Sequence, residues 1–202
     1  MDSRIRGRAA QLVALLPCLE IEIKFRVADH SELETRLRTL GFRQKTPRTH
    51  EMNLLYDFAD RRLTKSGALL RIRQFGERWT VTHKSKGSVG RHKHREEIET
   101  VMQDGARLGT IFEALGMSVV FRYEKFRSEW TDQNGHVVLD ETPIGDFAEI
   151  EGEPAWIDEI AEKLGVSHDQ YITQSYSDLF FEWKRQTGST APELTFAAVA
   201  LV

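Results

Sequence analysis

The chain has 202 residues, 40% of them hydrophobic and 29% charged, which is typical of a globular protein and excludes a largely disordered one. Its 28 basic and 31 acidic side chains leave a net charge of −3, which argues against a nucleic-acid-binding protein with a generally basic surface. The single cysteine, Cys18, excludes an intramolecular disulfide and a cysteine-rich zinc site, and it indicates a reducing compartment.

The two ends of the chain differ from its centre. Arginines near the N-terminus precede the apolar run Leu12–Leu16, as in an export signal, but no small-residue cleavage pattern follows. The last residues are small and apolar, and neither they nor any other apolar run is long enough to span a membrane. We therefore expect a cytoplasmic protein with an N-terminal extension at 1–18, one domain at 19–186 and a C-terminal tail at 187–202.

Turn signals divide the domain into strands and a few helices, and the short connections predict a mostly antiparallel arrangement. Strands are expected at residues 19–27, 42–58 (as one or two strands), 68–75, 79–86, 92–102, 119–131, 136–141 and 147–152. Helices are expected from the cap Asp29-His30-Ser31 to Gly41, from Asp104 to near Gly116, and over 156–164 and 175–184. Asn134-Gly135 predicts a two-residue hairpin turn, and Gly87–Gly90 predicts a flexible loop.

The first strand carries two acids and a base at every second position. Because residues two apart in a strand point to the same face, Glu20, Glu22 and Lys24 share one face, and isoleucines lie on the other. Later strands repeat this pattern, and in each of them the charged residues lie at every second position and so on one face. These charged sets are Arg71 and Arg73; Lys84 and Lys86; Lys93, Arg95, Glu97 and Glu99; Lys125 and Arg127; and Glu149 and Glu151.

Two interpretations of this alternation are open. A strand taken alone commonly has one solvated face. However, like charges at adjacent positions of one face repel each other, so pairs of arginines and pairs of glutamates suggest an oppositely charged ligand between them. Arginines suit phosphate oxygens, and clustered carboxylates suit Mg²⁺ or Mn²⁺. The combined pattern predicts an α+β fold, an antiparallel eight-stranded β-barrel with a polar interior and helices packed outside.

Several segments, in this order, resemble the motifs of the CYTH, or triphosphate tunnel metalloenzyme, superfamily. Glu20-x-Glu22-x-Lys24 resembles the ExExK signature at the start of the domain. The other matching segments are Tyr56-Asp57, Leu63, Gly67 and Leu69-Leu70-Arg71-Ile72-Arg73; Thr82-His83-Lys84; Arg95-x-Glu97-x-Glu99; Lys125-x-Arg127; Leu139-Asp140; Glu149-Ile150-Glu151-Gly152; and Ser175-Tyr176-Ser177-Asp178-Leu179.

The resemblance implies a barrel that binds a small-molecule triphosphate together with Mg²⁺ or Mn²⁺. The implied metal ligands are Glu20, Glu22, Glu149 and Glu151, with Asp140 as a further candidate. The implied substrate contacts are Lys24, Arg71, Arg73, Lys84, Arg95, Lys125 and Arg127, of which Lys24, Lys84 and Arg127 are the candidate catalytic residues. Arg95 is also expected to join Glu97 and Glu99 in an inner network that orients the other side chains.

The residues inside the signature distinguish branches of the superfamily. The version Ile23-Lys24-Phe25-Arg26-Val27 looks more like the class IV adenylyl cyclases than like members that read Glu-Arg-Lys. We therefore rank an adenylyl cyclase, which converts ATP to cyclic AMP and pyrophosphate, above a triphosphatase acting on inorganic triphosphate, thiamine triphosphate or a nucleoside triphosphate. A non-catalytic polyphosphate- or nucleotide-binding module and a structural barrel with solvated charges are the other hypotheses. A homodimer is compatible with the aromatic C-terminal helix, and neither nucleic acid nor a membrane is expected as a partner.

Overall fold

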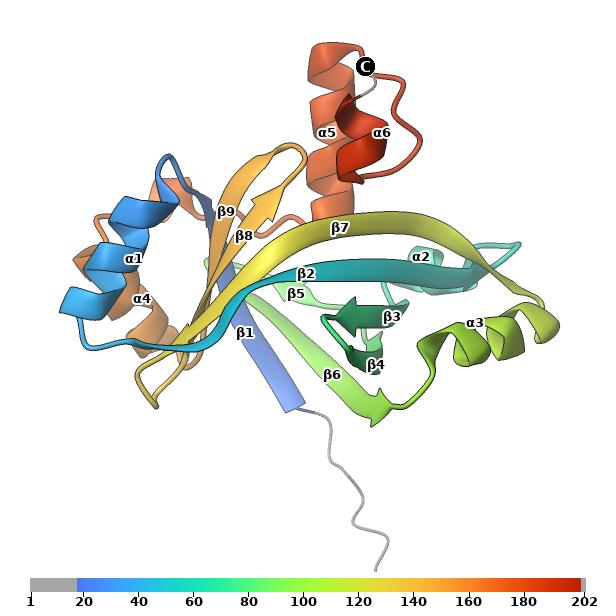
Figure 1. The fold of residues 1–202 in the computed structure, drawn as a ribbon, viewed down its shortest axis with the longest axis horizontal. Coiled ribbons are helices and arrows are strands. Elements are labelled where there is room, and N and C mark those ends of the chain that lie inside the picture. Colours follow the sequence, from blue (N-terminus) through green and yellow to red (C-terminus); the bar gives the residue numbers. More distant parts are fainter. Residues whose placement is uncertain (1–17, 201–202) are drawn as a thin grey trace, which may run out of the picture.

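The structure is a computed structural model that describes residues 18–200, apart from the side chain of Val89. The expected N-terminal extension therefore lies, except for Cys18, outside the described residues. Eight long strands form the centre of the fold, and helices surround them (Figure 1). The long strands are β1 (Cys18–Arg26), β2 (Arg43–Phe58), β3 (Leu69–Phe75), β4 (Arg78–Lys84), β6 (Lys93–Met102), β7 (Met117–Thr131), β8 (His136–Thr142) and β9 (Gly145–Glu151).

The eight strands close into a barrel. Their order is β1-β9-β8-β7-β2-β3-β4-β6, and β6 pairs back with β1 through register pairs such as Glu20 with Arg95. All neighbouring strands run antiparallel. The short strand β5 (Ser88–Val89) adds to one edge of β6. The predicted antiparallel eight-stranded barrel is confirmed.

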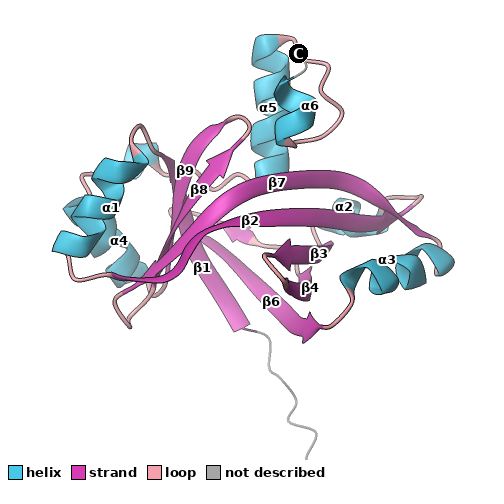
Figure 2. Ribbon diagram, in the orientation of Figure 1, coloured by secondary structure: helices cyan, strands magenta, loops and turns pink. Residues whose placement is uncertain are grey.

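The helices cover the outside of the barrel (Figure 2). They are α1 (His30–Thr39), α2 (Arg62–Ser66), α3 (Gly105–Ala114), α4 (Pro154–Lys163), the 3₁₀ turn η1 (His168–Gln170), α5 (Tyr176–Thr187) and α6 (Phe196–Ala200). Local signals explain where they start: Asp29 accepts hydrogen bonds from the amides of Ser31 and Glu32, and Ser175 and Asp178 form a capping box. No helix within residues 18–200 combines the length and apolar character that crossing a membrane requires.

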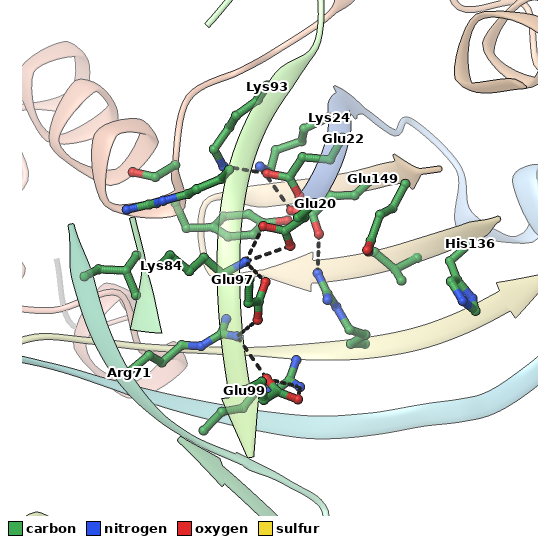
Figure 3. A pocket seen from close by; sticks show the side chains of 18 of the residues that line it. Glu20, Glu22, Lys24, Arg71, Lys84, Lys93, Glu97, Glu99, His136 and Glu149 are labelled. Carbon is green, nitrogen blue, oxygen red and sulfur yellow. Dashed lines mark hydrogen bonds and ion pairs between the residues drawn. The ribbon is translucent and has the colours of Figure 1, made fainter. Parts of the chain in front are cut away.

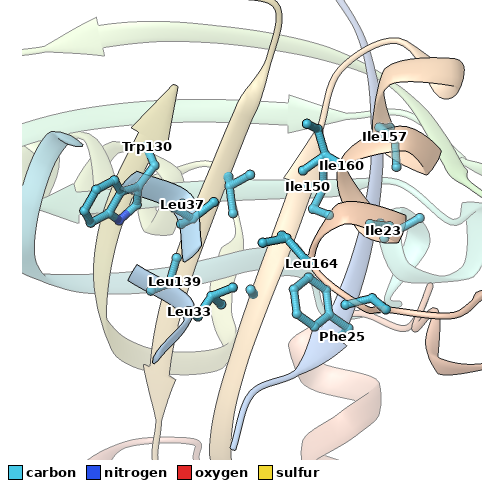
Figure 4. Packing of buried hydrophobic residues seen from close by; sticks show 14 of the residues in the cluster. Ile23, Phe25, Leu33, Leu37, Trp130, Leu139, Ile150, Ile157, Ile160 and Leu164 are labelled. Atoms are coloured by element: carbon cyan, nitrogen blue, oxygen red, sulfur yellow. The ribbon is translucent and has the colours of Figure 1, made fainter. Parts of the chain in front are cut away.

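The largest apolar core lies between the barrel wall and two helices, and not inside the barrel. Ile23 and Ile150, from the outward faces of β1 and β9, pack with Leu37 of α1 and Ile157 of α4 (Figure 4). All four side chains are fully buried. Burying a side chain of this size contributes about 1.5–3 kcal/mol. Because the isoleucines of the first strand face this outer core, its charged residues must face the barrel interior.

Three turn and loop predictions differ from the structure. Thr131 pairs with His136, so β7 and β8 are joined by four residues and not by a two-residue Asn-Gly turn. Asp132 accepts the amides of Asn134 and Gly135, and a Cβ on Gly135 would lie 2.4 Å from the ring of Trp156. The glycine is therefore required by packing against α4. The expected loop 87–90 contains β5, and the strand expected to reach residue 86 ends as β4 at residue 84.

The segment after α5 packs on the outside of β7. The Leu194 amide donates to the Arg122 carbonyl at 3.1 Å, and the Glu124 amide donates to the Leu194 carbonyl at 3.0 Å. Leu194 is fully buried in a second core with Phe180 and Phe121. Residues 188–200, for which the sequence suggested no role, therefore cover one side of the barrel. Phe181 of α5 is half exposed, and a homodimer stays a prediction.

Candidate functional site

The barrel encloses a charged cavity of about 430 Å³. All the predicted site residues except Asp140 line it. They are Glu20, Glu22, Lys24, Arg71, Arg73, Lys84, Arg95, Lys125, Arg127, Glu149 and Glu151. The parity of each strand turns these side chains inward, as the alternation in the sequence predicted. The cavity thus has a polar interior made by strands from both ends of the domain.

Acidic side chains gather where the first and last strands of the barrel meet. In the register of β1 and β9, Glu22 lies opposite Glu151, and Lys24 lies opposite Glu149. Glu20 is on the same face of β1 as Glu22, two residues away. Four carboxylates from two adjacent strands therefore share one region of the cavity wall.

Three of these four glutamates form ion pairs with lysines (Figure 3). The ammonium of Lys84 lies 2.7 and 2.5 Å from the two carboxylate oxygens of Glu20, and 2.7 Å from Glu97. Lys93 Nζ lies 2.5 Å from Glu22 Oε1, and Lys24 Nζ lies 3.1 Å from Glu149 Oε1.

These pairs shift the pKa values of the partners. Burial opposes charge on Lys24 and Lys84, yet the carboxylates beside them raise both lysine pKa values above the ordinary range. Burial likewise opposes charge on Glu149, but Lys24 and Arg127 hold its pKa well below the ordinary range. These groups are therefore charged at neutral pH.

The fourth glutamate is in a different electrostatic environment. Partial desolvation at the rim of the cavity, followed by the negative charges of Glu20 and Glu22, raises the pKa of Glu151 to about 7, although part of the side chain remains exposed to solvent. Within residues 18–200, no three His, Cys, Asp or Glu side chains lie close enough together to hold a metal ion as they stand. The donor set still suits a hard divalent cation, because it consists of carboxylate oxygens whose mutual repulsion a cation would relieve.

Apart from Lys24 of β1, the basic side chains of the cavity come from other strands of the barrel. Arg71 and Arg73 of β3 lie near Glu99 of β6, with nitrogen–oxygen distances of 3.7 and 3.2 Å. Lys125 and Arg127 project from β7. The cavity therefore places arginine and lysine groups opposite the glutamate-rich strands, as binding of a metal–polyphosphate requires.

Asp140 has a different environment from the other predicted metal ligands. It is fully buried and does not line the cavity. Its oxygens accept hydrogen bonds from Lys125 at 2.8 Å, from Arg127 at 2.7 and 2.6 Å, and from the Tyr176 hydroxyl at 2.6 Å. Donors from the protein already occupy the Asp140 carboxylate. We therefore propose that Asp140 holds Lys125 and Arg127 in position, and that it does not bind the metal.

Arg95 also has partners of its own. Its guanidinium donates to the Ser85 carbonyl at 2.5 Å and to the Gly67 carbonyl at 2.8 Å, and burial lowers its pKa. Arg95 therefore ties two connections at the edge of the barrel together while lining the cavity. Its expected network partners Glu97 and Glu99 instead contact lysine and arginine groups of the wall.

Sequence reasoning missed Glu51 of β2. This carboxylate is fully buried and lies 3.6 Å from Lys125, 3.9 Å from Arg127 and 4.0 Å from Arg73. Burial raises its pKa, but these cations outweigh burial and lower the pKa to about 2. Lys93 and His136, which also line the cavity, were not among the predicted site residues. The pairings of β2 with β7, which sets Glu51 opposite Lys125, and with β3, which sets Asn53 opposite Arg73, reveal that Glu51 faces inward.

The histidines on β4 and β6 do not form a metal site. His92 points away from the cavity, and its Nε2 lies 2.8 Å from Asp158 of α4, outside the barrel. His94 lies on the same outward parity, and His83 is exposed on β4.

Comparison with known proteins identifies the family. The CYTH domain family model matches residues 19–176, which is most of the chain. The chain belongs to the CYTH family. The resemblance inferred from the ordered motifs is thus confirmed, and the barrel described above is a CYTH barrel.

Related proteins match this chain over nearly the whole CYTH barrel. A protein from Methanocaldococcus jannaschii named "Putative adenylate cyclase" is 28% identical over 172 residues, covering 80% of this chain and 98% of the relative. A structure with the same description from Vibrio parahaemolyticus superposes with a TM-score of 0.73 at 19% identity, covering 82% of this chain and 99% of that chain. A Hippeastrum protein, described as an adenylyl cyclase candidate with a dominant triphosphatase activity, has a TM-score of 0.61 at 20% identity, covering 81% of this chain and 95% of that chain.

Proposed function

We propose that this CYTH protein is a divalent-metal-dependent enzyme that acts on a triphosphate, with ATP conversion to cyclic AMP and pyrophosphate as the first candidate reaction. The observation that carries this proposal is the division of the cavity wall into a glutamate-rich side on β1 and β9 and a basic side on β3, β4 and β7, to which Lys24 of β1 and Arg95 of β6 add their charges. A volume of about 430 Å³ lies within the range of small-molecule sites. A solvated surface would not need eleven inward-facing charged residues.

The acidic side supplies the proposed metal site. Glu20, Glu22, Glu149 and Glu151 would hold Mg²⁺ or Mn²⁺, since both ions prefer carboxylate oxygens. A bound divalent ion supplies positive charge that stabilises the negative charge developing on phosphate oxygens. Glu97 and Glu99, which also line the cavity, contact the cations Lys84 and Arg73 instead.

The basic side supplies the proposed phosphate contacts. Lys24, Lys84 and Arg127 pair directly with glutamates of the acidic side, and they would bind the oxygens of the reacting phosphoryl group. The further substrate contacts proposed here are Arg71, Arg73, Arg95 and Lys125. These fixed cations neutralise charge without reorganisation during the reaction, because their ion pairs already orient them.

Two reactions fit this arrangement. In a cyclase, the ribose 3′-hydroxyl attacks the α-phosphorus and pyrophosphate leaves. In a triphosphatase, water attacks the γ-phosphorus and orthophosphate leaves. The name of the Methanocaldococcus relative supports the first reaction, and the activity described for the Hippeastrum protein supports the second as an alternative. A non-catalytic polyphosphate-binding module is the third candidate.

Product analysis tests the proposal. The protein would be incubated with Mg²⁺ or Mn²⁺ and, in separate reactions, ATP, inorganic triphosphate or thiamine triphosphate. Cyclic AMP with pyrophosphate establishes the cyclase, orthophosphate establishes the triphosphatase, and binding without any product leaves the non-catalytic module. Glu151→Gln should remove metal-dependent turnover, whereas Glu153→Gln, an exposed acid two residues further on, should not. Full turnover in the Glu151 variant would refute the metal assignment.

A further inference from the structure

One ion pair in the cavity joins two residues that have no other charged partner. Lys93 Nζ lies 2.5 Å from Glu22 Oε1, and the residues face each other in the register of β1 and β6 (Figure 3). Among residues 18–200, Lys93 forms an ion pair with no other carboxylate, and Glu22 with no other cation. The side chains are 15% and 11% exposed and both line the cavity. Lys93 thus occupies the carboxylate that is proposed to hold the metal.

Two cations that pair with the other glutamates of the cavity are held more firmly. Arg127 is fixed by two bonds to Asp140 and a contact with Glu149. Lys84 bridges Glu20 and Glu97. Lys93, in contrast, is an ammonium on a flexible four-carbon chain with one charged partner. It can therefore change partner at a smaller cost in broken contacts than Lys84 or Arg127.

We propose that Lys93 binds polyphosphate by exchanging partners with Glu22. In the free protein the two side chains neutralise each other; in the complex Glu22 faces the divalent cation and Lys93 faces the polyphosphate. This inference rests on the proposed function of the cavity. It assigns Lys93 to substrate binding and makes metal and polyphosphate binding interdependent at this pair.

The exchange has a thermodynamic consequence. A polyphosphate that binds alone must separate Lys93 from Glu22 and leave the carboxylate unpaired, which is costly for partly buried charges. A divalent cation that binds alone must separate the same pair and leave the Lys93 ammonium unpaired. When both bind, neither charge is left unpaired, so each ligand should increase the affinity for the other. Simple attraction between metal and polyphosphate would not require Lys93.

A double-mutant cycle tests the exchange without turnover. Isothermal titration calorimetry would measure binding of the bis-methylene analogue of triphosphate, in which carbon replaces both bridging oxygens, to wild type, Glu22→Gln, Lys93→Gln and the double variant in EDTA. With Lys93 present, Glu22→Gln should increase metal-free affinity by at least about fivefold, since it releases the lysine. In the Lys93→Gln background the same change should alter affinity by less than about twofold. Equal effects in both backgrounds would overturn the exchange.

A second titration adds Mn²⁺. The factor by which Mn²⁺ increases affinity for the analogue should be at least about fivefold smaller in Lys93→Gln than in wild type. Metal–analogue complexation in solution is the same for both proteins and cancels in this ratio. Lys86→Gln provides the control, because Lys86 is an exposed lysine that does not line the cavity, and its ratio should equal that of wild type. A Lys93→Gln ratio that matches wild type would refute the coupling.

These outcomes separate the inference from the proposed function. If wild type binds neither Mn²⁺ nor the analogue, both the proposed function and the exchange are wrong. If wild type binds both ligands and the cycle is additive, only the exchange is wrong. Unchanged melting temperatures of the free variants, measured alongside, would show that altered affinities do not come from unfolding.

Discussion

The hydroxyl of Tyr176 donates a 2.6 Å hydrogen bond to Asp140, and the ring of the same tyrosine lies beneath two lysines of the cavity. Lys24 Nζ and Lys125 Nζ are 4.5 and 4.6 Å from the ring centroid. Burial, followed by the charge of Asp140, raises the pKa of Tyr176 well above its ordinary value, so the hydroxyl keeps its proton. The first residue of α5 therefore orients both an anion and two cations of the barrel wall.

We expect the hydroxyl and the ring of Tyr176 to make separable contributions. Tyr176→Phe removes one hydrogen bond to a carboxylate and should destabilise the protein by about 1.5–3 kcal/mol. Tyr176→Leu also removes the cation–π contacts and should weaken triphosphate binding further. Urea denaturation and KM for the triphosphate measure the two effects. Equal KM values for the two variants would contradict a role for the ring.

Glu51 makes the stability of the barrel depend on pH. Its pKa of about 2 in the folded protein lies below the ordinary value of 4.5. A carboxylate with a lowered folded-state pKa stabilises the protein above the unfolded pKa, and this contribution is lost as the pH falls from about 4.5 towards 2. The shift corresponds to about 3 kcal/mol. The charge of Glu51 should therefore stabilise the folded protein at pH 7 and contribute little near pH 2.

Comparing wild type with Glu51→Gln isolates this contribution, because all other carboxylates titrate in both proteins. The difference in unfolding free energy should be largest at neutral pH and shrink steadily between pH 4.5 and the acid limit of the folded state. Urea titrations at pH 7, 5, 4 and 3 measure it. A difference that is constant over this range would show that Glu51 is not held ionised by Lys125, Arg127 and Arg73.

The inward faces of most strands could be predicted because strand parity is a local property. Glu20 and Glu22 share a face whatever the rest of the chain does, and Ile21 between them marks the apolar side. The parity of a residue does not tell, however, how deeply its side chain is buried. Asp140 shares the inward parity of β8, but it is enclosed by Lys125, Arg127 and Tyr176, contacts that only folding brings together.

Register and long-range packing were not predictable from local patterns. Glu51 could not be assigned to a face because the consecutive apolar residues Leu54, Leu55 and Tyr56 break the alternation of the strand, at the register shift between Leu55 and Tyr56. The turn at Asn134-Gly135 was predicted wrongly because the decisive contact is with Trp156, about twenty residues away in the chain. Such contacts depend on the closed barrel and its covering helices.

Lys24 should contribute mainly to triphosphate binding. It is almost fully buried, contacts Glu149 and donates to the Gln174 carbonyl at 3.2 Å, so its ammonium is already directed into the cavity. Lys24→Ala should raise KM for the triphosphate by roughly 10- to 100-fold, the loss expected for one charge-assisted hydrogen bond. Lys163→Ala on the exposed face of α4 serves as the control. An unchanged KM and kcat in Lys24→Ala would exclude the assigned role.

Leu194 tests whether the C-terminal segment is part of the barrel's stable structure. Its side chain is fully buried beside Phe121 and Phe180, and its backbone bonds to β7. Leu194→Ala should cost about 2–5 kcal/mol, because it leaves a cavity in a packed core. For a chain of this length that corresponds to a fall in Tm of roughly 5–15 °C by calorimetry.

The matched control for Leu194→Ala is Glu193→Gln, which affects a partly exposed ion pair with Arg122 and a long 3.4 Å hydrogen bond from the Thr195 hydroxyl, and which should change stability by less than about 0.5 kcal/mol. Since Leu194 does not line the cavity, Leu194→Ala should retain the triphosphate KM of wild type at temperatures well below its own Tm. A loss of affinity in the folded variant would mean that the segment also supports the site, through β7 and the cations Lys125 and Arg127 that this strand carries. An unchanged Tm would instead show that the segment can leave β7 without exposing the core, contrary to the burial of Leu194.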